Sequence, residues 1–234
     1  MSSLSPTSPP PEQSKADRVY RELRRRIREL TLPPGAVLRK EEIALEMGVS
    51  RAPVSEAIAR LADEALVDVF PQHGSFVAPI RAADVRESLL IRTALEVEAI
   101  RRVTQKGEAA LLATLEENLR AQAAALETSD LALFYDLDEA LHGAIFSALK
   151  APRALRLLEA ARAPLDRPRR IGLPEVGRPE ATLAEHRRLV DAIASGDPEY
   201  AAAAMRAHLS MVAKTVEREL ADIDPEVAAV RGQN

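Results

Sequence analysis

The chain of 234 residues contains no cysteine and no tryptophan. Without thiols it has no disulfide bond, no cysteine nucleophile and no thiolate metal ligand. Only 3% of the residues are aromatic, so the hydrophobic core has to be built from aliphatic side chains. Glycine is also scarce, with 9 residues, which argues against an all-β fold and against a glycine-rich nucleotide-binding loop.

Long apolar runs and a targeting signal are missing as well. No run approaches the ~20 apolar residues of a membrane span. Residues 1–13 are rich in proline and serine and lack the basic-then-apolar order of a signal peptide. We therefore expect a cytoplasmic protein without membrane association, and a disordered tail over residues 1–13.

The net charge of −4 is unevenly distributed along the chain. Residues 1–80 contain eleven basic and eleven acidic residues, so the whole excess of acid lies in residues 81–234. Six arginines fall between positions 18 and 28. A local basic cluster can contact nucleic acid even in an acidic protein, because the field at the contact matters more than the total charge. The alternative is a solvated helix face on which these arginines pair with Glu22 and Glu29.

Residues 14–80 have the pattern of a winged helix-turn-helix. Apolar residues at helical spacing predict three helices, over residues 15–30, over residues 40–47 and from Ser50 onward. The glycine of Gly48-Val49-Ser50 supplies the short turn between the second and third helices, and two β-rich runs around Pro71–Gly74 predict a hairpin. DNA binding is typical of this order of elements, and a plain three-helix bundle with a hairpin is the alternative.

The first residues of the second motif helix contact base edges in such proteins. In this chain the base-reading candidates are Ser50, Arg51, Ala52 and Ser55.

Beyond Pro79 the sequence is typical of a second domain made of long helices rich in alanine and leucine. The expected helices span residues 82–105, 108–127, 130–149, 152–165, 181–195 and 198–220. Proline and glycine break residues 166–180 into a loop, and residues 221–234 predict a flexible tail. The predicted fold class is therefore mainly α, with a winged helix-turn-helix over 14–80 and an antiparallel all-α bundle of six or seven helices over 81–220.

Every histidine of the bundle falls on an apolar stripe. The stripes place His142, His186 and His208 on the inward faces of three helices, and Asp138 lies one turn from His142 on the same face. A single inward histidine is usually a hydrogen-bonded core residue. Four unsatisfied buried groups would be costly, however, and one cation that accepts three imidazoles and a carboxylate satisfies them together. We therefore predict a divalent metal of the zinc, nickel or manganese type, and the ligand set does not choose among these ions.

Arg92 and Glu96 continue the apolar stripe of the helix over residues 82–105. Two interpretations fit the spacing equally well: an i,i+4 ion pair at the edge of the bundle, and an inward arginine that holds a carboxylate through two hydrogen bonds. In the second interpretation a small organic acid binds beside the metal, and Arg92 and Glu96 are its candidate ligands.

With these motifs in place, the first segment resembles the DNA-binding domain of GntR-family transcriptional regulators. The marks of the family are the PPG turn, the junction GVSRAPV and the wing sequence HGSFV. The second segment is similar to the FCD ligand-binding domain of the FadR-like subfamily. Its marks are Arg92 with Glu96, Asp138 with His142, Glu185-His186, and Arg206-Ala207-His208-Leu209.

The resemblance implies a homodimer that binds a short palindromic operator in double-stranded DNA, as a repressor released by a small organic acid. It implies that Arg51 reads the operator and that His73 and Gly74 form a wing tip at the minor groove. The residues that match the family's metal positions are Asp138, His142, His186 and His208. Arg92 matches a cavity arginine that helps to hold a carboxylate effector.

Two departures from the family limit what can be transferred. Ser55 stands where a second arginine is common, and Ala151 stands where an asparagine often follows the metal helix. The operator sequence and the identity of the effector are therefore not carried over.

Other roles stay open at this stage. Arg39, Lys40 and the cluster Arg24–Arg28 are candidates for contacts with DNA phosphates. A metal-sensing regulator would respond to the ion itself, and a metal-dependent hydrolase would use the ion to activate water. Against an enzyme, the sequence has no HExxH motif, no nucleophile elbow and no phosphate loop, and Glu96 is the only candidate base beyond the metal ligands.

Overall fold

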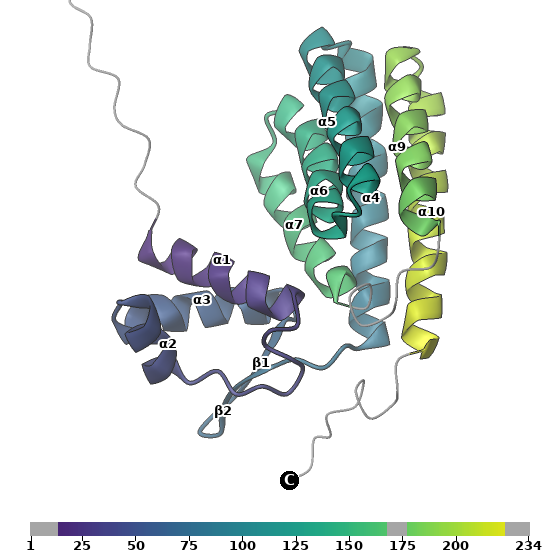
Figure 1. Ribbon diagram of the computed structural model, residues 1–234. Coiled ribbons are helices and arrows are strands. Elements are labelled where there is room, and N and C mark those ends of the chain that lie inside the picture. The colour runs from purple at the N-terminus through teal and green to yellow at the C-terminus, as the bar shows by residue number, and fades with distance from the viewer. Residues whose placement is uncertain (1–13, 168–176, 223–234) are drawn as a thin grey trace, which may run out of the picture. The chain divides into compact units, whose positions relative to one another are not determined.

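The computed structural model describes residues 14–167 and 177–222. The chain divides into two compact units, with the division between Pro79 and Ile80. The predicted fold class is confirmed: a helix-turn-helix with a β-hairpin wing comes first, and a bundle of helices follows (Figure 1). The expected N-terminal tail over residues 1–13 lies outside the described residues.

The N-terminal unit consists of three helices and a hairpin. Its elements are α1 (Lys15–Arg28), α2 (Lys40–Met47), α3 (Arg51–Asp63), β1 (Val67–Phe70) and β2 (Gly74–Val77). Helix α1 begins after Ser14, whose hydroxyl accepts a hydrogen bond from the backbone N–H of Asp17 at 3.0 Å. Val19, Leu23 and Ile27 recur at helical spacing and are all buried, which fixes the inner face of this helix.

Gly48 determines the turn between α2 and α3. Its φ of 64° lies in the left-handed region, which glycine enters without the steric cost of a Cβ. Ser50 occupies the N-cap position of α3, and its hydroxyl makes no capping hydrogen bond. The helix therefore starts immediately after the turn, with its first residues at the surface.

The wing is a two-stranded antiparallel hairpin in which Val67 pairs with Val77 and Phe70 pairs with Gly74. Gly74 has a φ of 113°, which a residue with a side chain rarely adopts. A bridge between Val37 and Phe76 ties the hairpin to the segment that leads into α2. These pairings hold the wing beside the start of α2.

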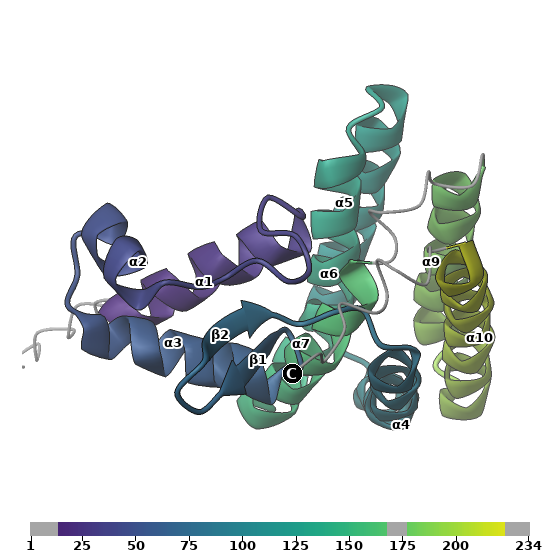
Figure 2. The same ribbon diagram turned by 90° about the horizontal axis from the view of Figure 1, so that it is seen from below.

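The second unit contains six helices among the residues that the structure describes. They are α4 (Ala82–Lys106), α5 (Ala109–Glu127), α6 (Leu131–Ala148), α7 (Pro152–Asp166), α9 (Arg178–Ala194) and α10 (Pro198–Asp222). Long helices lie side by side in two views of this unit (Figures 1 and 2). One cluster of side chains drawn from all six helices fills its centre, and Phe146 is the one aromatic residue among its buried members.

Three expected helix boundaries were wrong by two residues or more. Helix α1 ends at Arg28 rather than at 30, because Leu30 lies in the left-handed region with a φ of 59°. Helix α9 begins at Arg178 rather than at 181, because Pro179 falls in its first turn, where no backbone N–H is needed. Helix α10 continues to Asp222, beyond the expected start of the C-terminal tail at 221, since the next helix-breaking residue in the sequence is Pro225. The rest of that tail, residues 223–234, lies outside the described residues.

No helix in the described part of the chain is long and apolar enough to cross a membrane.

Replacement of Leu115 by alanine tests the aliphatic core of the bundle. Leu115 on α5 is fully buried, so the cavity and the lost transfer free energy should lower the free energy of unfolding by ~2–5 kcal/mol. Urea unfolding followed by circular dichroism measures the change. The control is Leu133→Ala, because the Leu133 side chain is 46% exposed. If both variants unfold at the same urea concentration, the assignment of the core is wrong.

Candidate functional site

The start of α3 presents the expected base-reading residues to solvent. Ser50, Arg51 and Ala52 are exposed, and Ser55 is partly buried. The side chain of Arg51 is 71% exposed, and its guanidinium donates a hydrogen bond to Oε1 of Glu41 at 3.1 Å. An ion pair this exposed contributes little to stability, so Arg51 can exchange Glu41 for another acceptor at small cost.

A hollow lies between the start of α2 and the wing. Among the residues that line it are Arg39, Lys40, His73 and Gly74, together with the exposed apolar side chains of Val37, Val69 and Phe70. The structure therefore brings four of the expected DNA-binding residues to one concave surface. Arg39 has an exposed partner in Glu42, at 3.3 Å.

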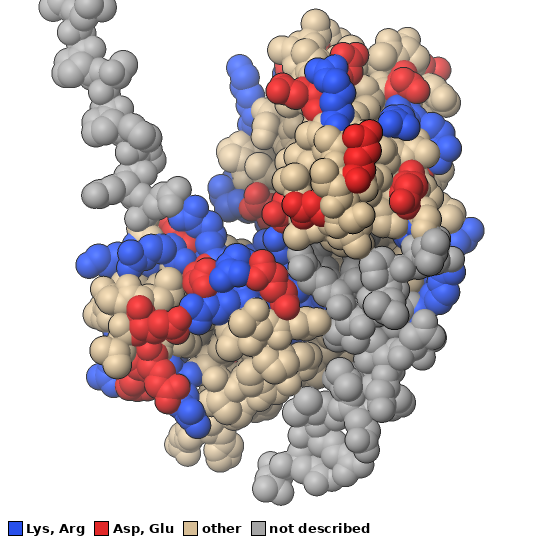
Figure 3. Space-filling model, viewed as in Figure 1, with Lys and Arg blue, Asp and Glu red and all other residues tan. Residues whose placement is uncertain are grey.

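The arginine cluster of α1 is an ion-pair network. Arg25 pairs with Glu22 and Glu29, and Arg26 pairs with Glu22 and Glu46. Lys and Arg side chains alternate with Asp and Glu side chains on the visible face of this unit (Figure 3). This arrangement favours the solvated-face interpretation of the cluster over phosphate binding.

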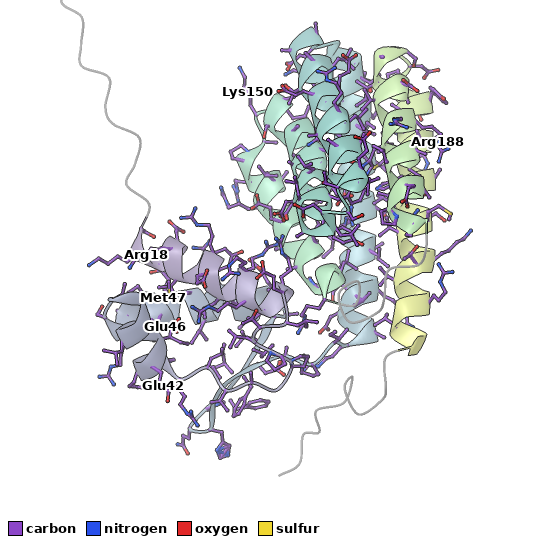
Figure 4. All side chains as sticks on the ribbon, in the orientation of Figure 1. Arg18, Glu42, Glu46, Met47, Lys150 and Arg188 are labelled. Atoms are coloured by element: carbon purple, nitrogen blue, oxygen red, sulfur yellow. The ribbon has the colours of Figure 1, made fainter. Side chains whose placement is uncertain are left out.

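One arginine of α1 caps the C-terminal end of α2. The guanidinium of Arg18 donates to the backbone carbonyl of Met47 at 2.7 Å, close to Glu46 (Figure 4). A cation at this position also interacts favourably with the C-terminal end of the helix dipole.

Three histidines meet inside the bundle, from three helices. His142 on α6, His186 on α9 and His208 on α10 are all buried, and one ring nitrogen of each lies within 4.8 Å of the others. Arg188, two residues after His186, points out of the bundle and is exposed (Figure 4). The apolar stripes of the sequence thus predicted the direction of the histidines correctly.

The Nδ1 atom of each ring faces a partner of its own. The partners are Glu96 for His142, Gln122 for His186 at 2.8 Å and Glu185 for His208 at 2.8 Å. A carboxylate can only accept a hydrogen bond, so Nδ1 of His142 and of His208 carries the proton in a neutral ring. Burial lowers the pKa of His208 to about 3 and holds the pKa of His142 below its usual value, which keeps both rings neutral.

The tautomer of His186 follows from a chain of amides. The side-chain amide of Asn118 donates to the carbonyl of Leu137 at 3.0 Å, and its oxygen accepts from the amide of Gln122 at 2.6 Å. The oxygen of Gln122 therefore faces His186, whose Nδ1 has to donate. In a neutral ring whose Nδ1 donates, Nε2 is the acceptor atom. None of the three Nε2 atoms has a hydrogen-bond partner among the described residues.

Asp138 completes the cluster. Its Oδ1 lies 3.2 Å from Nε2 of His186 and 4.0 Å from Nε2 of His142, and its Oδ2 pairs with Arg162. Burial opposes ionisation, but the Arg162 guanidinium outweighs it and holds the pKa of Asp138 well below its usual range. An ionised oxygen opposite imidazole lone pairs is stabilised by a cation between them. Three imidazoles and a carboxylate are a donor set that suits a divalent transition metal.

Arg92 and Glu96 form a buried pair, with 2.7 Å between Nε and Oε1. The i,i+4 ion pair predicted for these residues is present, but it lies inside the bundle and not at the edge. The second carboxylate oxygen of Glu96 contacts His142. Burial by itself would raise the pKa of Glu96, but the charge of Arg92 opposes this effect and the pKa is lowered overall. The carboxylate therefore stays ionised. Glu96 thus positions a histidine, and Arg92 is the member of the pair that faces a cavity.

That cavity lies beside the histidines. Its lining residues are Arg92, Tyr135, Asp138, Arg178, Pro179, Thr182, His208, Val212 and Thr215. Two metal-ligand candidates and two guanidinium groups therefore face one space. A small anion that enters it reaches the metal position and an arginine together.

Sequence reasoning missed several residues of this site, and most carried a signal. Gln122 lies seven residues after Leu115, and Arg162 lies four after Leu158, so each is a polar residue on an apolar stripe. The rule that found Asp138 would also have found them. Arg178 gave no such signal, because it lies in a segment interpreted as a loop.

Comparison with known proteins identifies the chain. Residues 15–77 match the family "Bacterial regulatory proteins, gntR family", and residues 87–211 match the FCD domain. The chain is 38% identical to an HTH-type transcriptional regulator from an unstable DNA locus of Streptomyces ambofaciens, over 86% of this chain and 84% of the relative. It is 33% identical to the HTH-type transcriptional repressor RspR of Escherichia coli K12, over 92% of both chains.

Solved structures agree on the fold. Escherichia coli McbR/YncC is similar with a TM-score of 0.77 and 21% identity, over 88% of this chain and 99% of that one. A GntR regulator of Rhodococcus sp. RHA1 is similar with a TM-score of 0.72 and 23% identity, over 90% and 99%.

The chain therefore belongs to the GntR family, in the FadR-like subfamily with an FCD C-terminal domain. It is a DNA-binding transcriptional regulator. Because its relatives are regulators, the hydrolase alternative is set aside.

The buried neutral histidines predict how the metal-free protein responds to acid. In the unfolded chain they ionise near the ordinary pKa of 6.5, whereas in the folded chain His208 and His142 resist protonation. The unfolded state then binds more protons, so the free energy of unfolding should fall between about pH 7 and pH 5.5, by about 1 kcal/mol from His208 alone, and His142 acts in the same direction. Urea unfolding of metal-stripped protein at several pH values measures this slope.

Two variants separate the buried histidines from the rest of the chain. His208→Gln should make the slope shallower, because it removes the buried ring whose pKa is lowered to about 3. His73→Gln, a change at an exposed position of the wing, is the matched control. An unaltered slope in His208→Gln contradicts the account.

Proposed function

We propose that this regulator is a homodimeric repressor whose affinity for a palindromic operator is controlled by a small carboxylate bound at a divalent metal in the bundle. One observation carries the proposal. The Nε2 atoms of three clustered, buried histidines have no hydrogen-bond partner in the described part of the chain, and one of these histidines, His208, lines a cavity together with Asp138 and Arg92.

In this proposal the start of α3 reads the operator. Arg51 donates to a base edge in the major groove, with Ser50, Ala52 and Ser55 beside it. Arg39 and Lys40 contact phosphates, and the wing tip approaches the minor groove through His73 and Gly74. Two observations support these roles. Arg51 is exposed, and one hollow is lined by Arg39, Lys40, His73 and Gly74.

The repressor role rests on a relative, and the dimer rests on the family resemblance. RspR of Escherichia coli K12, 33% identical over 92% of the chain, is named a transcriptional repressor. A dimer with two-fold symmetry matches a palindromic operator, since each half-site then meets one recognition helix.

The metal ligands in the proposal are Asp138, His142, His186 and His208. The ion, of the zinc, nickel or manganese type, supplies positive charge and an open coordination position for the carboxylate. Glu96, Gln122 and Glu185 hold the imidazoles in the tautomer that the ion requires, and such outer partners commonly tune metal affinity. Arg92 donates to the bound carboxylate.

The chain offers a short link from the bundle to the wing. The backbone N–H of Ala78 donates to the carbonyl of Leu66 at 2.9 Å, which fixes it in the first unit. Ile80 is buried in a cluster with Val85 and Val212 of the bundle. Only Pro79 separates these two anchored residues. A shift of α4 on effector binding would therefore be transmitted along the chain to Ala78 at the end of the wing.

Arg51→Ala tests the reading role. The variant should lose ~1–3 kcal/mol of specific affinity, because one charged hydrogen-bond donor to a base is removed. The measurement is a gel-shift titration with a duplex selected from random sequences by the full-length protein. The matched control is Arg39→Ala, which should weaken selected and unselected duplexes alike and lower the salt dependence. Equal loss on both duplexes for Arg51→Ala contradicts the assignment.

The effector role is tested with the zinc-loaded full-length protein and the same duplex. A panel of small carboxylates should contain at least one that lowers operator affinity, and chelation of the metal should abolish that response. Insertion of a short Gly-Ser segment after Pro79 should uncouple carboxylate binding from DNA release. If the metal alone changes DNA affinity and no carboxylate does, the protein is a metal sensor and the effector proposal fails.

A further inference from the structure

The outer face of α4 presents apolar side chains at the surface of the bundle. Leu90 is 71% exposed and Ile91 is 39% exposed, and the exposed Ala94 follows one turn later on the same side of the helix. In the described part of the bundle, no other large hydrophobic side chain is as exposed as Leu90. The opposite face of α4 already supplies the core, through residues such as Ile100. Adjacent apolar side chains left at the surface in this way indicate a binding surface.

Two ion pairs connect α10 to α4 at the two ends of this face. Nε of Arg86 lies 2.8 Å from Oε1 of Glu217, and Nε of Arg101 lies 2.7 Å from Oε1 of Glu199, so the two helices run antiparallel (Figures 1 and 2). The exposed residues of α10 between these pairs include several with small side chains, namely Ala203, Ala207 and Ser210. Small side chains at these positions leave room for a further helix beside Leu90.

The charged residues at the two ends of the face differ in sign. Near the N-terminal end, Glu87 is exposed and has no ion-pair partner among the residues that the structure describes. Near the C-terminal end, Arg102 is 65% exposed and shares its carboxylate partner, Glu98, with Arg101. A face with an acid at one end and a base at the other is complementary to a second copy of itself turned end to end.

We propose that two copies of the chain associate through this face, with their α4 helices antiparallel across a two-fold axis near Ala94. Glu87 lies seven positions before Ala94, and Arg102 lies eight positions after it. An antiparallel pair centred there therefore places each Glu87 opposite the Arg102 of the second copy, and Leu90 beside the second copy's Ala94. The inference rests on the homodimer of the proposed function and names its surface.

The charges also select this register over its neighbours. An axis midway between Ile91 and Ala94 would bury the apolar side chains equally well, but it would set Glu87 opposite Glu98 of the second copy. Like charges across an interface are costly. A parallel pair of α4 helices would likewise set Glu87 opposite Glu87.

Cross-linking tests the position of the axis, because the chain contains no cysteine of its own. Ala94→Cys should give a disulfide-linked dimer of the full-length protein under mild oxidation, since a residue at a two-fold axis lies beside its own copy. The control is Ala113→Cys, at an exposed position of α5, which should remain unlinked. Equal linking of the two variants, or no linking of Ala94→Cys in a dimeric protein, overturns the inference.

Sedimentation equilibrium of the full-length protein tests the apolar part of the face. Leu90→Asp should raise the dissociation constant of the dimer at least about ten-fold, because each copy loses an apolar contact and buries a charge. The fold should be retained, since the Leu90 side chain is mostly exposed. Leu157→Asp is the matched control, because Leu157 on α7 is 59% exposed. If Leu157→Asp weakens the dimer as much as Leu90→Asp does, the assignment of the face is wrong.

Exchange of the end charges tests the antiparallel order. Glu87→Arg should weaken the dimer about ten-fold, because it sets arginines opposite each other in two places. Addition of Arg102→Glu should restore the dimer, since both pairs form again with their signs exchanged. Addition of Arg120→Glu, an exposed change on α5, is the control. Restoration by Arg120→Glu to the same extent would contradict the pairing.

These measurements also separate the inference from the proposed function. If the unmodified chain sediments as a monomer at every concentration, the proposed homodimer itself fails. If the chain is dimeric and Leu90→Asp leaves its dissociation constant unchanged, the homodimer stands and the α4 face is wrong.

Discussion

The organisation of the bundle depends on three buried histidines whose Nε2 atoms have no hydrogen-bond partner among the described residues. Each Nε2 is an acceptor because its Nδ1 is committed to Glu96, Gln122 or Glu185. Acceptors facing a carboxylate oxygen inside an aliphatic core are unfavourable unless a cation joins them. The surrounding ion pairs follow from the same constraint, since each buried carboxylate needs a positive partner.

Much of this could be predicted from the sequence. The helices follow from apolar spacing, and the inward direction of His142, His186 and His208 follows from their place on those stripes. The turn at Gly48 was predictable because a glycine separates two short segments of helical apolar spacing, and the structure gives that glycine a positive φ. Local rules therefore determined the elements and the faces that they present.

Partners across helices could not be predicted in the same way. Arg162 reaches Asp138 from a different helix, and Gln122 reaches His186 across 64 positions of the chain. Which polar residues meet depends on how the helices rotate and pack, and spacing along one helix does not contain that information. Arg178 was missed for a local reason, because the proline of its first turn resembled a helix breaker. The arginine cluster of α1 had two interpretations that only its contacts with Glu22, Glu29 and Glu46 could separate.

Function in this chain is divided between two units joined by a short anchored link. The first unit carries an exposed arginine whose ion pair with Glu41 is weak, and the second carries three buried histidines. A protein with net charge −4 can bind DNA through one surface, because the field at the contact matters more than the total charge.

The most direct test is a zinc titration of the metal-stripped full-length protein by calorimetry. We expect one tightly bound ion per chain, with binding lost in His186→Gln and retained in His73→Gln. Absence of stoichiometric binding in the unmodified chain, or equal binding by both variants, would contradict it.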